Sequence, residues 1–413
     1  MTKLKIVVLI IIASCQIFAE GGSLYTRFGI GDLHSPFSAR RFAMGELGIA
    51  LSDKDYLSFM NPAGLNELRL TRFETGFIYS GVDAQNSASS IYHTRINING
   101  MMAGFPLDSK HGISFSFGLL PYSDVGYDVV TTHSDPLVKD YSATYSGKGG
   151  LSKFTMGGSY RLPFNFSVGL TYDYYFGRIE ANSSATFLAD SSLYNASFHR
   201  ENSYHGMGMT AGLISNDLSK IFNIEGFREF RIGLVYSPSV TLSVDSMNYV
   251  KSVISTVQTA TGSVKMNLPY KLGVGTAFNL FSKYTFTLDY LFQPFTQFTS
   301  NNKSSSNLQD YYKMSLGFEY RDAESRSDEF WDRVMYRAGI SYEQSQYKIN
   351  GTGIDQYSIY AGLAFPIAFD NTIDLGFQYG RRGTTDNSLL RENIFKFNVT
   401  VSLGELWFLQ TDR

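Results

Sequence analysis

The 413-residue sequence predicts an all-β protein: a transmembrane antiparallel β-barrel of about fourteen strands with an amino-terminal plug. Three observations support this prediction: a two-residue alternation of apolar and polar side chains, the length of the alternating runs, and the pattern of links between them. A period of two is the side-chain period of a β-strand. In one such run we expect lipid contact for Phe166, Val168, Leu170 and Tyr172, and lumen contact for Ser167, Gly169, Thr171 and Asp173.

The alternating runs are long enough to cross a bilayer. Residues 92–104, 166–177, 268–278 and 394–404 reach the roughly 9–11 residues of a tilted transmembrane strand, whereas strands of soluble proteins usually have about 5–6. The 28 Tyr and 33 Phe residues suit a lipid-facing band with aromatic girdles. Beyond the first residues, no segment has the roughly 20 apolar residues of a membrane helix.

The links between the runs alternate, for the most part, between long and short. The long links are expected at 80–91, 123–152, 178–203, 241–266, 293–311 and 381–393, and the short ones at 106–110, 163–165, 279–283 and 368–371. Outer-membrane barrels have short periplasmic turns and longer outside loops. We therefore expect a protein of the outer membrane of a Gram-negative-type envelope, with both termini in the periplasm.

The amino terminus predicts export. Lys3 and Lys5 precede an apolar stretch over 6–13 that is too short to span a membrane. Residues 1–19 are thus expected to be a signal peptide cleaved after Ala19. The alternative is lipidation at Cys15, the only cysteine in the chain. If Cys15 is removed, disulfide and thiol chemistry are excluded from the mature protein.

Residues 20–71 precede the barrel of 72–413 and do not alternate like strands. Asn61 is expected to cap a short helix that has Pro62 at its first position, where a missing N–H costs nothing. A barrel wider than about eight strands cannot fill its lumen with wall side chains alone. We therefore expect this segment to form a plug inside the barrel.

The segment Asn61-Pro62-Ala63-Gly64-Leu65, placed before about fourteen strands, resembles the long-chain fatty acid outer-membrane transporter family (FadL-type, OMPP1/TodX-like). The resemblance implies a hatch at Asn61, Pro62, Ala63 and Gly64, and passage of hydrophobic small molecules. The carboxy-terminal third resembles a Bacteroidetes-type branch through three segments: Tyr336-Arg337-Ala338-Gly339, Gln378-Tyr379-Gly380-Arg381-Arg382-Gly383-Thr384 and Leu403-Gly404-Glu405-Leu406-Trp407-Phe408.

One feature departs from the family. Barrels of this kind often end on an aromatic residue, whereas here Leu409-Gln410-Thr411-Asp412-Arg413 follows Phe408. We therefore expect the barrel-insertion machinery to recognise Trp407 and Phe408 at an internal position.

Other classes of chemistry find little support in the sequence. The net charge is −2 and no basic run is present, which argues against nucleic acid. The six histidines form no convincing ligand spacing, so no metal is expected. No nucleophile elbow is present, and we expect neither enzymatic activity nor a cofactor.

Charged residues on the polar faces of the strands allow two interpretations. In the first, opposite charges form a network that joins plug and wall. In the second, one or two cations bind a ligand carboxylate in an otherwise apolar pocket, where low dielectric strengthens the contact. The candidates for the second interpretation are Arg95, Arg161, Lys271 and Arg337.

The third strand of the barrel contains a proline. Pro121 follows a clear lipid-facing alternation and precedes Tyr122 and Gly126. Proline cannot donate to a strand ladder, so it lies at ends, edges or bulges. Either the strand ends at Leu120, or it is bent and leaves a gap in the wall; family members are thought to use such a gap as a lateral exit.

The sequence leads to two functional hypotheses. The first is passive uptake of hydrophobic small molecules such as long-chain fatty acids, with the protein surrounded by outer-membrane lipid; the exit is lateral or past the plug. The alternative is a non-transport barrel that acts as a scaffold or cargo-binding partner of a secretion system. A continuous apolar track through the lumen supports the first, and a lumen filled with salt bridges supports the second.

Overall fold

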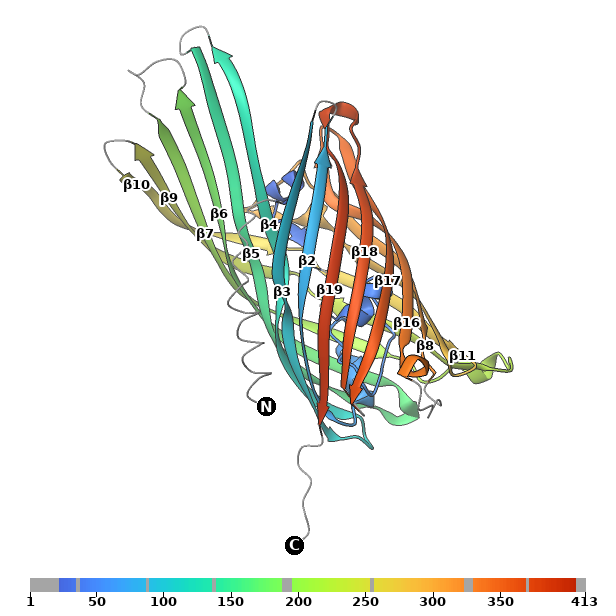
Figure 1. Ribbon diagram of the computed structural model, residues 1–413. Coiled ribbons are helices and arrows are strands. Elements are labelled where there is room, and N and C mark those ends of the chain that lie inside the picture. Colours follow the sequence, from blue (N-terminus) through green and yellow to red (C-terminus); the bar gives the residue numbers. More distant parts are fainter. Residues whose placement is uncertain are drawn as a thin grey trace, which may run out of the picture.

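The protein is a closed antiparallel β-barrel of 14 strands, which confirms the predicted fold class. The computed structural model describes residues 22–34, 38–86, 89–135, 139–187, 195–252, 256–322, 330–368 and 371–405. The proposed signal peptide 1–19, Cys15, Trp407 and Phe408 lie outside these ranges. Figure 1 shows the barrel from the side, with an amino-terminal segment inside it.

The wall is built from consecutive antiparallel neighbours. Its strands are β2 (Thr71–Gln85), β3 (Ser90–Asp108), β4 (Ile113–Asp135), β5 (Lys139–Arg161), β6 (Ser167–Phe187), β7 (Ala196–Ile214), β8 (Phe227–Ser237), β9 (Val240–Ser252), β10 (Thr256–Leu268), β11 (Lys271–Leu280), β12 (Tyr284–Gln293), β15 (Tyr311–Tyr320), β16 (Met335–Ile349), β17 (Thr352–Ala368), β18 (Asn371–Gly383) and β19 (Arg391–Glu405). The barrel closes where β19 pairs with β2, from Arg391↔Gln85 to Glu405↔Thr71.

Two of the spans are interrupted at prolines. Pro238 lies between β8 and β9, and Pro269 lies between β10 and β11. Proline interrupts a ladder because it has no N–H to donate. Strand β7 pairs with both β8 and β9, so these two segments form one span of the wall, as β10 and β11 do; counting them so gives the 14 strands.

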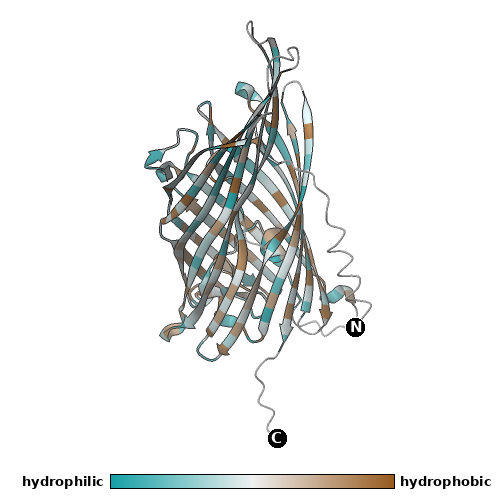
Figure 2. Cartoon of the chain, turned by 90° about the vertical axis from the view of Figure 1, so that its left-hand side faces the viewer, coloured by the Kyte–Doolittle hydropathy of each residue, from teal (hydrophilic) through white to brown (hydrophobic). Residues whose placement is uncertain are grey.

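The side chains of β6 alternate as the sequence predicts. Leu170 is 57% exposed on the outer face, whereas Asp173 is 0% exposed and points inward. Phe166 and Tyr172 are also exposed, and Ser167 and Thr171 are buried. Figure 2 shows apolar residues distributed over the strands of the wall. The predicted register of this strand is therefore confirmed.

Four expected long loops are in fact largely paired strands, and in the first of them the β2–β3 ladder continues to Gln85↔Ser90. Residues 123–135 and 139–152 continue the β4–β5 ladder to Asp135↔Lys139. The β6–β7 ladder likewise continues to Ala185↔Ala196, and the β9–β10 ladder continues to Lys251↔Thr256. Alternation arises where the two faces of a sheet meet different surroundings, whereas a hairpin with similar surroundings on both faces keeps its ladder without alternating. The predicted link boundaries were wrong for this reason.

Residues 22–34 and 38–70, here called the inner segment, are mostly irregular and are enclosed by the wall. They contain η1 (Leu24–Arg27), β1 (Asp32–Leu33), α2 (Ala39–Ala43) and η2 (Pro62–Glu67). Helix α2 contacts β16 to β19, and η2 contacts β4 to β7, on the opposite side of the barrel. Most side chains from residue 38 to 51 are buried. Among the described residues, no helix is long and apolar enough to cross a membrane.

Candidate functional site

The Asn61 motif docks the inner segment onto the wall. The Asn61 side-chain oxygen accepts a hydrogen bond from the Ala63 backbone N–H at 3.1 Å and caps η2, with Pro62 at its first position. This confirms the predicted helix cap. The Asn61 amide donates to the Ile49 carbonyl at 2.9 Å and to the wall carbonyl of Leu213 at 3.2 Å.

Glycines in the wall make room for this motif. A Cβ at Gly212 on β7 would collide with the Asn61 side chain, and a Cβ at Gly169 on β6 would collide with the Pro62 backbone. The hatch residues Asn61, Pro62 and Ala63 are all buried. Two adjacent strands therefore present side-chain-free positions that accept the motif at close range.

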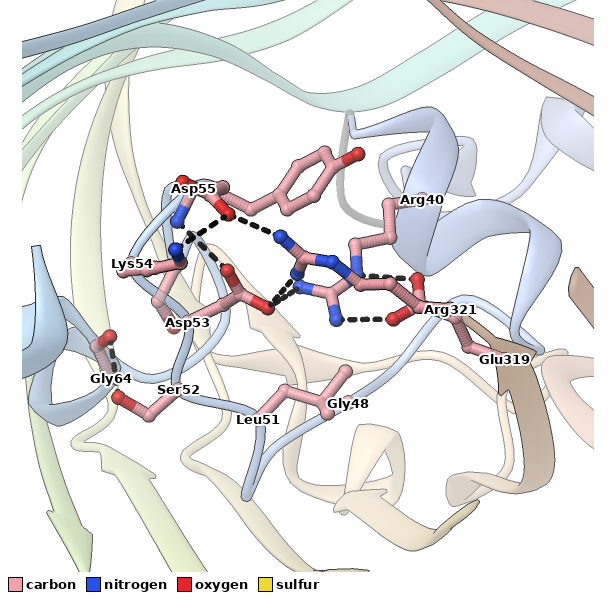
Figure 3. Close-up of polar contacts among 12 residues, drawn as sticks. Arg40, Gly48, Leu51, Ser52, Asp53, Lys54, Asp55, Gly64, Glu319 and Arg321 are labelled. Carbon is pink, nitrogen blue, oxygen red and sulfur yellow. Dashed lines mark hydrogen bonds and ion pairs between the residues drawn. The ribbon is translucent and has the colours of Figure 1, made fainter. Parts of the chain in front are cut away.

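Ion pairs join the inner segment to the wall (Figure 3). Arg40 of α2 binds Glu319 of β15 with both Nε and Nη2, at 2.8 and 2.7 Å, and binds Asp53 at 2.9 Å. Arg321, just beyond β15, binds Asp53 at 3.0 Å and also pairs with Asp55. Asp53 is thus held by one arginine of the inner segment and by one arginine of the wall.

The network continues along the inner face of the wall. Glu319 also accepts from Arg337 Nε at 2.7 Å, and Arg337 pairs with Asp374. The Tyr56 hydroxyl of the inner segment accepts from Arg337 Nη2 at 2.9 Å. Each nitrogen of the Arg337 guanidinium thus contacts one of these three partners, and its binding to a ligand carboxylate remains a prediction.

Further ion pairs join the inner segment to the wall through Glu46 and Asp32. Lys313 on β15 pairs with Glu46 and, at 3.2 Å, with Glu343. Arg382 on β18 binds Asp32 at 2.9 Å and Glu392 at 2.6 Å. Lys313 and Glu392 are fully buried. The described lumen is thus rich in paired charges, as in the first of the two interpretations drawn from the sequence.

The buried charges of the inner segment have shifted pKa values. Burial alone raises the pKa of Asp53, but the guanidinium groups of Arg40 and Arg321 outweigh it and hold that pKa below its usual value. Burial, with Arg40 nearby, lowers the pKa of Arg41 to about 10. Arg41 therefore stays cationic at neutral pH, and it donates to the Gly48 carbonyl at 2.6 Å and to Ser58 at 3.0 Å.

The wall is open between β3 and β4. Their ladder runs only from Asp108↔Ile113 to Met101↔Leu119, with a bulge near Pro106, although both strands continue beyond it. Residues 90–100 of β3 pair only with β2, and residues 120–135 of β4 pair with β5. We call the facing edges of these two stretches the seam; Figure 1 shows β4 leaning away from β3 there.

Pro121 lies where the seam begins. Strand β4 does not end at Leu120 but continues to Asp135, with a bulge against β5 between Pro121 and Ser123. The interpretation that the strand ends at Leu120 is therefore wrong, whereas a lateral exit at Pro121 remains a prediction. Tyr122 packs edge-on against Tyr175 with ring centroids 5.0 Å apart, and Gly126 leaves room for the Arg95 side chain.

Part of the seam is occupied by the inner segment. Strand β1 pairs antiparallel with β4 at Asp32↔Asp124 and Leu33↔Ser123. The Thr26 hydroxyl contacts both the N–H and the carbonyl of Gly126 at 3.1 Å. Arg95 of β3 pairs with Asp124 of β4 and so bridges the two edges. The gap thus holds a short strand and an ion pair.

A cavity of about 110 Å³ lies beside the seam. Its lining includes Arg95, His93 and Asp124 from the two seam strands. The inner segment and the other wall strands contribute further charged groups: Asp32, His34, Glu46, Glu343, Arg382 and Lys396. The lining is mixed, because Phe42, Ile78 and Ile394 contribute apolar surface beside these charged groups.

The other residues predicted to bind a ligand carboxylate lie apart from one another. Arg161 pairs with Glu67 at 3.5 Å and donates to the Asn66 carbonyl at 3.1 Å, at the η2 end of the inner segment. Lys271 lines a cavity of about 20 Å³ together with Lys153. The candidates Arg95, Arg161, Lys271 and Arg337 thus do not form one site.

The sequence pattern did not identify three residues of the ion-pair network in the lumen. Arg40, Asp53 and Arg321 lie outside the alternating runs, and their pairing depends on how the inner segment folds back on the wall. Strand β1, with two residues, is too short to produce a period. In the described ranges, no group of three or more His, Cys, Asp or Glu residues could hold a metal ion.

The closed barrel, its buried inner segment and the seam define an outer-membrane β-barrel. The family model BamG matches residues 1–412. The chain belongs to the BamG family.

Other proteins are similar over nearly the whole chain. Outer membrane protein P1 of Haemophilus influenzae is 21% identical, over 89% of each chain. The toluene transporter TbuX of Ralstonia pickettii superposes with a TM-score of 0.62 at 13% identity, over 90% of this chain and 99% of its own. The toluene transporter TodX of Pseudomonas putida gives 0.60 at 15%, over 92% and 100%. At this identity, the solved structures show a shared fold.

Proposed function

We propose that this barrel is a rigid outer-membrane scaffold that holds a partner through its wall and surface. The observation that carries the proposal is the ion-pair network between the inner segment and the wall. Arg40, Glu319 and Arg337 are all at most 5% exposed. Removing one partner of a buried pair costs about 3–5 kcal/mol, so an axial route that displaces the inner segment would break several such pairs.

The charged part of the cavity lining supports the same proposal. A fatty acid chain or an aromatic hydrocarbon gains free energy from apolar surroundings, whereas the cavity beside the seam combines apolar side chains with Arg95, Asp124 and other charged groups. Apolar residues of the inner segment and the wall also form a buried cluster, but they pack against one another, as Tyr25 and Tyr347 do with ring centroids 6.2 Å apart.

Native mass spectrometry of the barrel, released from its own outer membrane in mild detergent, tests the scaffold. We expect a complex with a second protein at fixed stoichiometry, and no fatty acid or hydrocarbon at one per barrel. A barrel that carries one hydrophobic molecule and no protein would overturn the proposal.

A second candidate function is uptake of hydrophobic small molecules, including long-chain fatty acids, through the seam. The unpaired edges of β3 and β4 favour it, since they open the wall sideways toward the bilayer. The fold is also shared with proteins named as toluene transporters. The uptake measurement on cross-linked protein described in the Discussion decides between the two.

The scaffold proposal extends to the surroundings of the barrel. We place outer-membrane lipid around the apolar face and both termini in the periplasm, and we assign recognition of the carboxy-terminal segment to the barrel-insertion machinery. We further propose that the protein is not an enzyme, uses no cofactor and belongs to a Bacteroidetes-type branch. Impermeant labelling of tags at either terminus in intact cells tests the orientation.

A further inference from the structure

The seam leaves a long strand edge without a strand beside it. Beyond Gly126, β4 continues to Asp135 while paired on one side with β5. No described strand pairs with its other side over these residues. At about 3.4 Å per residue, the nine residues from 127 to 135 offer an edge of roughly 30 Å.

Hydrogen bonds at the start of the seam show which backbone groups of β4 face the seam. The Tyr122 carbonyl accepts from the His34 N–H at 2.9 Å, and the Gly126 N–H donates to the Thr26 hydroxyl. Both contacts point toward the seam, and backbone groups in an antiparallel strand alternate in direction with a period of two. The N–H and C=O groups of Asp128, Val130 and Thr132 therefore face the seam as well.

The same edge already binds a strand of this chain. Strand β1 adds to it in antiparallel register at Asp124 and Ser123. On the amino-terminal side of β1, the chain turns away from β4. Gly29 and Gly31 adopt φ of +66° and +87° at this turn, and η1 precedes them in the sequence. The β4 edge can therefore accept an added strand, and β1 covers only the first part of this edge.

The side chains along the uncovered part indicate what fits there. Asp128 and Thr132 are exposed, and Val130 is 65% exposed. Asp128 forms no ion pair within the described ranges, whereas Asp124 is paired with Arg95. A β-branched residue suits strand pairing, and a free carboxylate favours a cation opposite it.

Resting on the proposed scaffold function, we propose that the β4 edge over residues 127–135 accepts an extended segment of a partner polypeptide. The segment runs antiparallel to β4, continues the register of β1 and carries a basic residue opposite Asp128. Main-chain hydrogen bonds supply the affinity in this mode of recognition, and side chains supply the specificity. An unpaired edge of this length is a template for another chain.

Photo-cross-linking in whole cells tests the pairing. p-Benzoylphenylalanine replaces Val130 in one protein and Thr132 in another, and the cross-linked peptides are sequenced by mass spectrometry. We expect both sites to reach one segment of a second protein, with the contact shifted by two residues toward its amino terminus from the first site to the second. Cross-links to lipid, to β3, to a second copy, or to a partner without this shift would overturn the proposal.

Three variants and a control site separate strand addition from simple proximity. With the cross-linker at 132, Val130→Pro removes one seam-facing N–H and leaves the β4–β5 ladder intact, so the yield should fall about tenfold, whereas Val130→Thr should retain it. Asp128→Asn should lower the yield about threefold. The control site is Tyr357, which is 64% exposed and paired on both sides; it should give no shifted pattern.

The outcomes distinguish this inference from the proposed function. If native mass spectrometry retains the protein complex but the shifted cross-links are absent, the partner binds elsewhere and only the strand addition fails. If no protein complex is found, the scaffold proposal fails with it.

Discussion

Glu319 of β15 and Arg40 of α2 form a two-pronged ion pair, with Nε–Oε2 and Nη2–Oε1 distances of 2.8 and 2.7 Å. The same carboxylate accepts from Arg337 at 2.7 Å. Charge-assisted bidentate contacts of this kind fix orientation as well as adding free energy. The position of the inner segment against the wall is thus specified by a carboxylate shared between two guanidinium groups.

Arg40→Met should destabilise the protein by about 3–5 kcal/mol, because Asp53 and Glu319 lose a partner while remaining buried. Guanidinium chloride unfolding in detergent measures the change. Lys54→Met is the matched control, since the Lys54 side chain is 57% exposed, and a surface substitution should alter stability by less than about 0.5 kcal/mol. Equal effects of the two variants would contradict the assigned role.

Acidification should weaken the attachment of the inner segment through Asp53. The pKa of this carboxyl is lower in the folded protein than its ordinary value of 3.8. Its contribution is therefore fully present above that ordinary value and is lost as the pH falls through the lower folded pKa. Melting temperatures followed by circular dichroism from pH 7 to pH 2 measure the loss. The melting temperature of the Asp53→Asn variant should be lower at pH 7 and should fall less between pH 7 and pH 2.

Leu170→Arg should cost about 2–4 kcal/mol near the middle of the bilayer, because Leu170 faces outward. Leu170→Phe is the control, because it keeps an apolar side chain at the same position. Unfolding in lipid vesicles gives both values. A smaller change for the arginine than for the phenylalanine would place this face away from lipid.

Deletion of residues 20–65 should leave a barrel that still inserts but conducts more ions. The deleted residues include α2 and the Asn61 motif, which contact opposite sides of the wall. Planar bilayer recordings compare the deletion with the full chain, and circular dichroism checks that the barrel has formed. Unchanged conductance in a folded barrel would show that the inner segment does not obstruct the lumen.

Closing the seam should distinguish lateral uptake from the scaffold. Pro121→Val restores a backbone donor at the bulge, and paired cysteines across the facing edges of β3 and β4 close the gap under oxidising conditions. If hydrophobic molecules leave through the seam, uptake of a labelled fatty acid or aromatic hydrocarbon falls on oxidation and recovers on reduction. The scaffold proposal expects the same low uptake in both states.

Much of the wall could be predicted because bilayer and lumen impose opposite demands on neighbouring residues. Leu170 and Asp173 show this contrast directly. The helix cap at Asn61 was likewise predictable, since it uses local hydrogen bonds. The hairpin beyond Gly126 was not, because the sequence loses its period there while the ladder with β5 continues. The pairing of Arg40 with Glu319 spans 279 positions in the chain, and no local pattern encodes it.

The pairing of β19 with β2 sets an order for making the protein. The two strands join the last part of the chain to the first part of the wall along their whole length. Until the carboxy-terminal strand has been exported, the sheet retains two free edges and cannot become a cylinder. The inner segment leaves the inner membrane first, yet it contacts both early and late strands. Its enclosure must therefore coincide with the final step of barrel assembly, and a truncated chain would carry that segment uncovered.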